Sequence, residues 1–170
     1  NDIAVGLRAL MRDELVRRPM VVDCDLHQGN GTAYIFRDEP AVFTFSIHQE
    51  NLYPVKQRSD VDVGLPDFCS GEHYLGLLRR HLLPALDQRE PDFVVYVAGA
   101  DPFSGDMLGS LSLTLDDMRA RDSLVLGECR SRRIPTAVVL GGGYCRSVED
   151  TVRVHFQTAT TLASLAEAEK

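Results

Sequence analysis

The arrangement of short apolar runs along the chain is the feature that most constrains its fold. Four such runs alternate with helical stretches and loops, and they cover residues 20–22, 41–47, 93–98 and 136–140. Apolar runs of this length without polar alternation are typical of strands that are buried on both faces. Strands that alternate with helices predict an α/β fold with a mainly parallel sheet.

The first half of the chain contains two predicted helices. Apolar side chains at helical spacing predict the first over residues 3–18, where Pro19 stops it. Residues 49–69 show little periodicity and are predicted to form a long loop. Ser70 is placed to cap the second helix, which Pro84 is expected to bend or shorten.

The second half contains two more predicted helices. Thr114 and Asp117 have the spacing of a capping box, which predicts a helix over residues 115–131. Ser147 and Asp150 are expected to open the last helix. Its predicted buried face consists of Val152, Phe156, Ala159, Ala163 and Ala166.

Length and charge exclude several classes of protein. A chain of 170 residues is long enough for one domain with a real core, so we expect a single domain over residues 1–170. With 18 Lys and Arg against 25 Asp and Glu, the net charge is −7, which disfavours direct binding of nucleic acid. No apolar run reaches the length of about 18 residues needed to cross a membrane.

Cysteine usage bears on the compartment. The four cysteines are widely spaced and form no Cys-x-x-Cys pair, so we expect mostly buried, free thiols in a reducing environment. No basic segment followed by an apolar stretch opens the chain, and the expected location is cytoplasmic. The cysteines are Cys24, Cys69, Cys129 and Cys145.

Unusual polar groups follow three of the predicted strands. Asp23, Asp25 and His27 come after the first, Asp101 follows the run at 93–98, and Tyr144 follows three glycines after the last. Because sites in parallel α/β sheets form beyond the carboxyl ends of the strands, these side chains are expected to converge.

The residue types at these strand ends favour a metal site. Alternation along an extended strand would place Asp23, Asp25 and His27 on one side, and such groups cannot be buried unpaired. An imidazole with two carboxylates, one from Asp101, suits Zn²⁺ or Fe²⁺ and leaves a position open for water. Taken alone, each motif is also compatible with ordinary loop or turn chemistry.

The same residues resemble the histone deacetylase family in order and spacing. Residues 27–31 read His-Gln-Gly-Asn-Gly, a form most similar to the class IV and bacterial branch. The resemblance covers essentially the whole chain, and its motifs are specific. The matching stretches are 22–32, 44–48, 96–101, 105–109, 111–122 and 140–144.

The resemblance implies a fold and a metal-dependent reaction. The fold would be the three-layer arginase/deacetylase α/β fold with its N-terminal strands missing. Asp25, His27 and Asp101 would bind zinc, with Fe²⁺ as the other candidate, and Tyr144 would hydrogen-bond the developing oxyanion. The reaction would be hydrolysis of an N-acetyl amide, with an acetylated lysine peptide or a small acetylated amine as the substrate.

The resemblance also implies two further groups of site residues. Asp23, Ser46 and Ile47, with the backbone of the metal motif, match a monovalent-cation site that usually holds potassium. Leu108, Gly142 and Gly143 match the wall of the channel that receives the acyl-lysine side chain.

One family feature is missing from these residues. Family members carry two adjacent histidines upstream of this region, before a phrase that ends in Asn-Asp, and this chain begins with Asn1 and Asp2. No two of its five histidines are adjacent; they are His27, His48, His73, His81 and His155. We therefore expect an incomplete deacetylase with an unpaired sheet edge and an uncovered apolar face.

Two other functions compete with deacetylation. The chain could bind a metal or acyl-lysine without turnover. A strand followed by Asp-x-Asp is also similar to haloacid-dehalogenase-type phosphatases, in which Asp23 would be the nucleophile. That chemistry needs a lysine near the site, and Lys56 and Lys170 are poorly placed for it.

Overall fold

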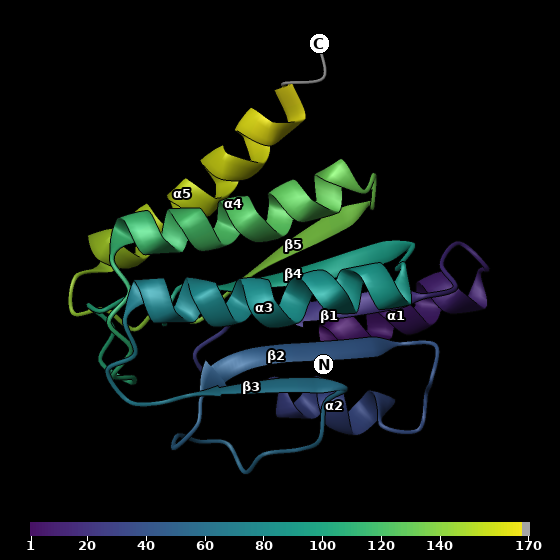
Figure 1. Ribbon diagram of the computed structural model, residues 1–170, viewed down its shortest axis with the longest axis horizontal. Coiled ribbons are helices and arrows are strands. Elements are labelled where there is room, and N and C mark those ends of the chain that lie inside the picture. Colours follow the sequence, from purple (N-terminus) through teal and green to yellow (C-terminus); the bar gives the residue numbers. More distant parts are fainter. Residues whose placement is uncertain (168–170) are drawn as a thin grey trace.

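The computed structural model describes residues 1–167 as a five-stranded, all-parallel sheet with helices on both faces (Figure 1). The strand order is β3-β2-β1-β4-β5. The strands are β1 Pro19–Asp23, β2 Phe43–Gln49, β3 Val61–Leu65, β4 Phe93–Gly99 and β5 Thr136–Gly141. The helices are α1 Asp2–Arg12, α2 Asn30–Phe36, α3 Gly71–Arg89, α4 Leu115–Ser131 and α5 Val148–Glu167.

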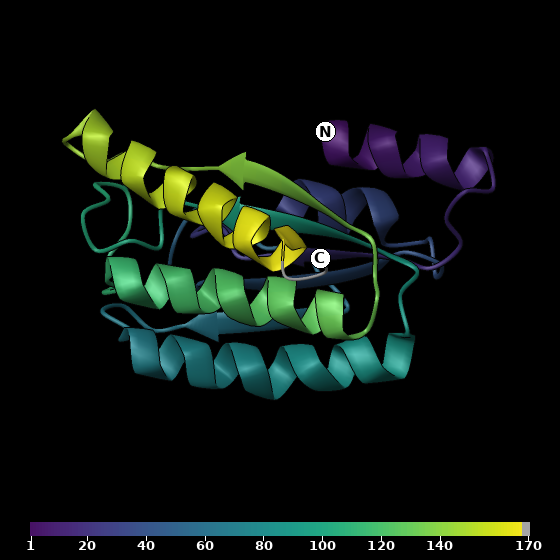
Figure 2. The ribbon, with the colours of Figure 1, turned by 90° about the horizontal axis from the view of Figure 1, so that it is seen from above.

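The molecule has three layers, as predicted from the sequence. Helix α1 lies on the opposite side of the sheet from α3 and α4 (Figure 2). Alternate strand residues divide between the two resulting cores. Val21 and Val95 pack with α1 and α2, whereas Val22 and Tyr96 pack with α3, α4 and α5. The three inner strands β1, β2 and β4 are therefore buried on both faces, which explains their uninterrupted apolar runs.

The central strand β1 brings the carboxyl ends of its neighbours β2 and β4 next to its own. β1 pairs with both β2 and β4, and Asp23 lies in register with Ser46 on one side and Val97 on the other. Because all strands are parallel, every carboxyl end opens onto the same edge of the sheet.

The predicted ends of helix α4 are confirmed. Thr114 and Asp117 form the reciprocal capping box, and the helix ends at Ser131. Helix α3 also begins after the predicted Ser70 cap, but Pro84 does not shorten it. Pro84 is exposed, so the carbonyl that loses its intrahelical partner can bond to water instead.

The first helix is shorter than predicted. It ends at Arg12, and Glu14 then takes a left-handed conformation with φ of 57°. The Leu15 N–H donates to the carbonyl of Leu10, which closes the helix with a local C-terminal motif. The apolar spacing continued past this point only because Leu15, which is exposed, happened to fit it.

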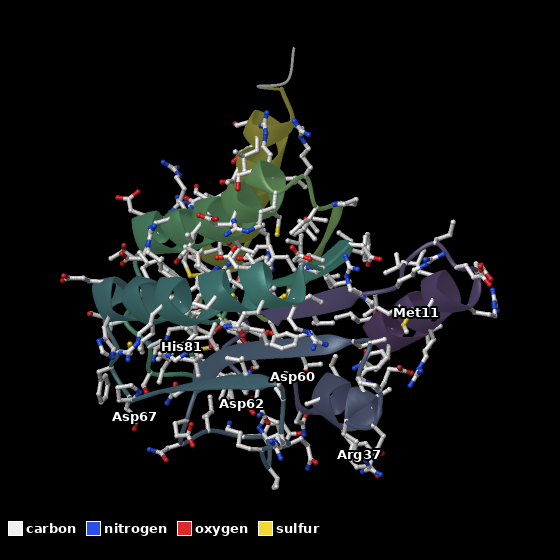
Figure 3. The ribbon with its side chains drawn as sticks, turned by 45° about the vertical axis from the view of Figure 1, so that its right-hand side comes forward. Met11, Arg37, Asp60, Asp62, Asp67 and His81 are labelled. Atoms are coloured by element: carbon white, nitrogen blue, oxygen red, sulfur yellow. The ribbon has the colours of Figure 1, made fainter. Side chains whose placement is uncertain are left out.

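The predicted long loop at 49–69 contains strand β3, which the sequence analysis missed. β3 is a five-residue edge strand in which buried Val63 and Leu65 alternate with exposed residues. Figure 3 shows Asp60, Asp62 and Asp67 along this edge. Thr44 and the side chain of Gln49 on β2 donate hydrogen bonds to Asp60 and Asp67, respectively.

The predicted buried face of the last helix is wrong. Helix α5 packs on α4 through Val154 and Thr158, whereas Val152 and Phe156 are exposed. Among residues 1–167, no strand pairs with the outer side of the neighbouring strand β5, and Leu140 on β5 is about half exposed. The expected unpaired edge and uncovered apolar face are therefore both present.

Two other expectations concern thiols and membranes. All four cysteines are free, and three of them are buried. Within residues 1–167, none of the helices combines the length and the apolarity needed to cross a bilayer.

Two substitutions distinguish the observed face of α5 from the predicted one. Phe156→Ser should change the free energy of unfolding by no more than about 0.5 kcal/mol, because the ring is already 68% exposed. Val154→Ser should cost about 2–3 kcal/mol, because this side chain is only 1% exposed. Urea unfolding measures both, and a larger loss for Phe156→Ser would mean that the helix faces the other way.

Candidate metal centre

Two consecutive tight turns position Asp25 and His27. β1 ends at Asp23, whose Oδ1 accepts a hydrogen bond from the Asp25 N–H at 3.0 Å. Asp25 Oδ1 in turn accepts from the His27 N–H at 2.8 Å. The convergence of these side chains thus comes from Asx-type turns after the strand, and not from the strand alternation expected from the sequence.

Asp101 reaches the same place from β4. Its carboxylate is buried, and Oδ1 accepts from the Leu26 N–H at 3.0 Å, which ties it to the loop after β1. Its Oδ2 lies 3.2 Å from His27 Nδ1, and Asp25 Oδ1 lies 3.3 Å from the same nitrogen. One ligand atom from each of Asp25, His27 and Asp101 lies within 4.8 Å of the others. The structure brings together the three residues predicted to bind a metal.

The electrostatics of this cluster favour a bound cation. Burial, helped by the nearby Asp25 carboxylate, raises the pKa of Asp23 to about 8, and burial also raises the pKa of Asp101. Hydrogen bonds from its ring to Asp101 and Asp25 raise the pKa of His27 to about 10. A proton on His27 thus partly offsets the carboxylates. A divalent metal would supply more positive charge, and three protein ligands would leave it an open position.

The residues predicted for a monovalent cation lie beside Asp23. Ser46 is buried on β2 in register with Asp23, and its hydroxyl lies 2.9 Å from His48 Nδ1. The Ile47 side chain is in the core, so only its main chain could face an ion. This site remains a prediction.

The glycine loop after β5 runs directly against Asp101. Gly142 has φ of 62°, and a Cβ there would lie 2.4 Å from Asp101 Cγ. Gly143 has φ of 97°, and a Cβ there would meet Thr151 at 2.4 Å. These two positions need glycine because the left-handed backbone and the close approach both exclude a side chain.

Asp106 accepts main-chain hydrogen bonds from Tyr144 and Leu108, the last two residues predicted for the site. Its Oδ2 accepts from the Tyr144 N–H at 2.6 Å, and its Oδ1 accepts from the Leu108 N–H at 2.8 Å. The side chains of Tyr144 and Leu108 are both about half exposed. The structure therefore places the glycine loop that precedes Tyr144 against Asp101, and leaves about half of the Tyr144 side chain exposed to solvent.

The sequence analysis missed Tyr53 as a neighbour of the cluster. Its ring meets His27 edge-on with 6.4 Å between centroids, and it is highly exposed. The Gln28 side chain makes two hydrogen bonds to the main chain of Gln57, in the loop that contains Tyr53. Nε2 donates to the Gln57 carbonyl, and Oε1 accepts from the Gln57 N–H. The loop has no periodicity, and only the polar Gln28 beside His27 hinted at such an anchor.

The lysine required for phosphatase chemistry is not found at Asp23. Lys56 Nζ donates to the main-chain carbonyls of Gln49 and Leu52. Lys170 lies outside the described residues.

The comparison with protein families shows to which family the chain belongs. The family model for the histone deacetylase domain matches residues 1–159. The chain belongs to the histone deacetylase family. Deacetylases of this family use a metal, and the cluster of Asp25, His27 and Asp101 is where the structure offers a site for one.

Individual relatives support this membership. An uncharacterized protein of Picosynechococcus sp. is 46% identical over 156 residues, which make up 91% of this chain and 52% of that protein. Histone deacetylase 2 of Arabidopsis thaliana is 32% identical over 150 residues, covering 86% of this chain and 39% of its own. The present chain thus spans about half the length, or less, of these relatives.

A solved structure shows the same fold. The acetylpolyamine aminohydrolase from Burkholderia pseudomallei superposes with a TM-score of 0.81 at 24% identity. The match covers 97% of this chain and 50% of that one. The fold expected from the sequence motifs is therefore confirmed, as a partial form of the deacetylase fold.

Metal binding at this cluster should release a proton. With its pKa raised to about 10, His27 is protonated at neutral pH, and a metal that binds Nδ1 must displace that proton. The apparent dissociation constant for Co²⁺ should therefore fall about 10-fold per pH unit near neutrality. Calorimetric titration in two buffers of different ionisation enthalpy measures the released protons. His81→Gln, a change on α3, should leave this release intact, and pH-independent binding would contradict the assignment.

The contact between Gly142 and Asp101 can be tested directly. Gly142→Ala should cost about 1–3 kcal/mol of stability and weaken Co²⁺ binding, because the new methyl group would displace the Asp101 carboxylate. Gly127→Ala on α4 is the matched control, since its Cβ would meet nothing within 4 Å and should stabilise the helix by about 0.5–1 kcal/mol. Equal effects of the two substitutions would show that the loop does not press on Asp101.

Proposed function

We propose that this chain carries the metal-binding residues of a deacetylase site that hydrolyses N-acetyl amides. The proposed metal is zinc, with Fe²⁺ as the alternative. The observation that carries the proposal is the convergence of Asp25, His27 and Asp101 at the carboxyl end of a parallel sheet. Two carboxylates and an imidazole form a donor set that suits these ions and leaves them open to substrate.

Each residue has a separate task in this proposal. The bound metal would polarise the amide carbonyl and lower the pKa of a water molecule. Asp25, His27 and Asp101 hold that metal, and the Leu26 N–H keeps the Asp101 carboxylate oriented. Tyr144 closes over the carbonyl from its glycine loop and donates a hydrogen bond to the oxyanion as charge develops.

A second cation would serve the same centre. We infer that Asp23, with Ser46 and the main chain of Ile47, would hold a potassium ion. A buried carboxylate whose pKa is raised to about 8 is costly to keep ionised without a cation nearby. Potassium at this position would keep Asp23 ionised and so fix the turn that presents Asp25.

The proposed substrate is an acetylated lysine side chain or a small acetylated amine. Leu108, Gly142 and Gly143 would line the path of its aliphatic stem, and the exposed ring of Tyr53, which contacts His27 edge-on, would lie at the entrance to that path. The Burkholderia protein is named for acetylpolyamines, but that likeness carries only the fold, so both substrate classes belong in the assay.

General acid–base catalysis needs groups beyond those in this cluster. None of the five histidines of the chain is adjacent to another, and His27 is committed to the metal. A missing acid–base pair typically costs about 10²–10⁴-fold in rate. We therefore propose that these 170 residues alone bind metal and turn over slowly, and the non-catalytic binding function is the alternative.

The experiment measures amine release from an acetyl-lysine peptide and from an acetylpolyamine, with Zn²⁺ or Fe²⁺ added. Two proteins are compared: the 170-residue chain, and a longer protein in which these residues follow a segment with adjacent histidines. The longer protein should be active and the chain alone slower by about 10²–10⁴-fold. In the longer protein, Asp101→Ala should abolish activity, and Tyr144→Phe should lower it by about 10²–10³-fold.

The outcomes separate the proposed functions. Activity that survives Asp101→Ala would contradict the metal-dependent mechanism. A longer protein that is folded and binds metal, but hydrolyses neither substrate, would favour the non-catalytic function. Lys56→Ala serves as a control. This lysine donates only to the nearby main-chain carbonyls of Gln49 and Leu52, so its replacement should not affect turnover.

A further inference from the structure

A fully buried ion pair lies in helix α4, where an apolar contact with the sheet would be expected. Arg121 and Asp122 are both 0% exposed. Arg121 Nε and Nη2 donate to Asp122 Oδ1 at 3.0 and 2.8 Å. Tyr96 donates to the same oxygen at 2.5 Å, and Thr158 donates to Oδ2 at 2.6 Å. The carboxylate is therefore satisfied by groups from α4, β4 and α5.

The third nitrogen of Arg121 points to the sheet. Nη1 donates to the main-chain carbonyl of Gly99 at 2.6 Å and to that of Cys24 at 3.3 Å. The Cys24 N–H still bonds to Val97, so these carbonyls lie where β1 and β4 stop pairing. Buried carbonyls beyond the end of a ladder need another donor, and one guanidinium supplies it to both strands.

These carbonyls belong to the segments that carry the metal ligands. Cys24 directly precedes Asp25, and Gly99 lies two residues before Asp101. The two segments are in close contact here, because a Cβ on Gly99 would lie 2.5 Å from the Asp25 Cα. A group that bonds to both carbonyls therefore sets the distance between the backbones of Asp25 and Asp101.

The Arg121–Asp122 pair would affect the metal centre through the positions of main-chain atoms and not through its charge. Asp122 neutralises Arg121, so the pair adds little net charge to the cluster of carboxylates. A buried ion pair is also weak evidence for stability, since apolar residues of similar volume often serve as well. What apolar residues cannot supply is a rigid fork of donors that engages a carboxylate and two carbonyls together.

We infer that Arg121 is a positioning residue of the metal centre: it holds Asp25 and Asp101 at binding distance through the carbonyls of Cys24 and Gly99. Asp122 orients the guanidinium for this task through Oδ1, the oxygen to which Tyr96 also donates, whereas Thr158 contacts only the other oxygen, Oδ2. The inference rests on the proposed metal-binding function of the cluster.

Cobalt binding to the 170-residue chain tests the inference, because the visible absorption of Co²⁺ reports affinity and coordination geometry without any turnover. Arg121→Lys keeps the charge but replaces the planar fork, whose nitrogens are spread over several ångströms, by a single ammonium nitrogen that does not reproduce this arrangement. It should weaken Co²⁺ binding about 10-fold and change the shape of the absorption band. Thr158→Val is the matched control. It removes one hydrogen bond from Asp122 but none from the strands, so it should lower thermal stability and leave the Co²⁺ spectrum unchanged.

Binding is measured well below the thermal transition of each variant, so that a loss of folding is not counted as a loss of affinity. Arg121→Lys with the Co²⁺ affinity and spectrum of Thr158→Val would overturn the inference. A folded parent chain that binds no Co²⁺ would overturn the proposed metal centre, and the inference with it. Should Arg121→Lys not fold, Asp122→Asn replaces it, because the guanidinium then loses its charged anchor. Co²⁺ binding several-fold weaker than in Thr158→Val supports the inference, and equal binding overturns it.

Discussion

The structure depends on how buried carboxylates are tolerated at one end of a parallel sheet. Asp23, Asp25 and Asp101 repel one another as anions, and two of them are buried. They are held together by main-chain N–H groups from the turns after β1 and by the ring of His27. Sheet register, the turns and the glycine loop all contribute to keeping these groups within reach of one another.

Much of the fold and the candidate site could be predicted because their signals are local. The capping box at Thr114 and Asp117 involves only neighbouring residues, and its helix was predicted at both ends. That Asp25, His27 and Asp101 lie at one edge could be predicted because parallel strands all open there, but the turns that aim Asp25 and His27 could not. Their metal-binding role and the roles of Tyr144 and Leu108 remain proposals.

The errors came from tertiary context that no local pattern records. Helix α5 carries apolar residues around much of its circumference, so periodicity could not decide which face would pack, and Val154 was buried in place of Phe156. Strand β3 was missed because its five residues include an aspartate and a glycine, and they form a strand only by pairing with β2. The Tyr53 contact and the Arg121 network join residues far apart in sequence, which spacing cannot reveal.

The two edges of the sheet differ in how they would treat a foreign strand. β3 carries Asp62 and is flanked by Asp60 and Asp67, and charges on an edge discourage other chains from adding to it. β5 reads Thr-Ala-Val-Val-Leu-Gly, without a charge or a proline, and no strand in the described part of the chain pairs with its outer edge. Such a segment is a template for intermolecular strand addition. Strands from other copies would therefore add to the sheet at β5 and not at β3. Self-association of the isolated chain would start at β5 and would increase with concentration.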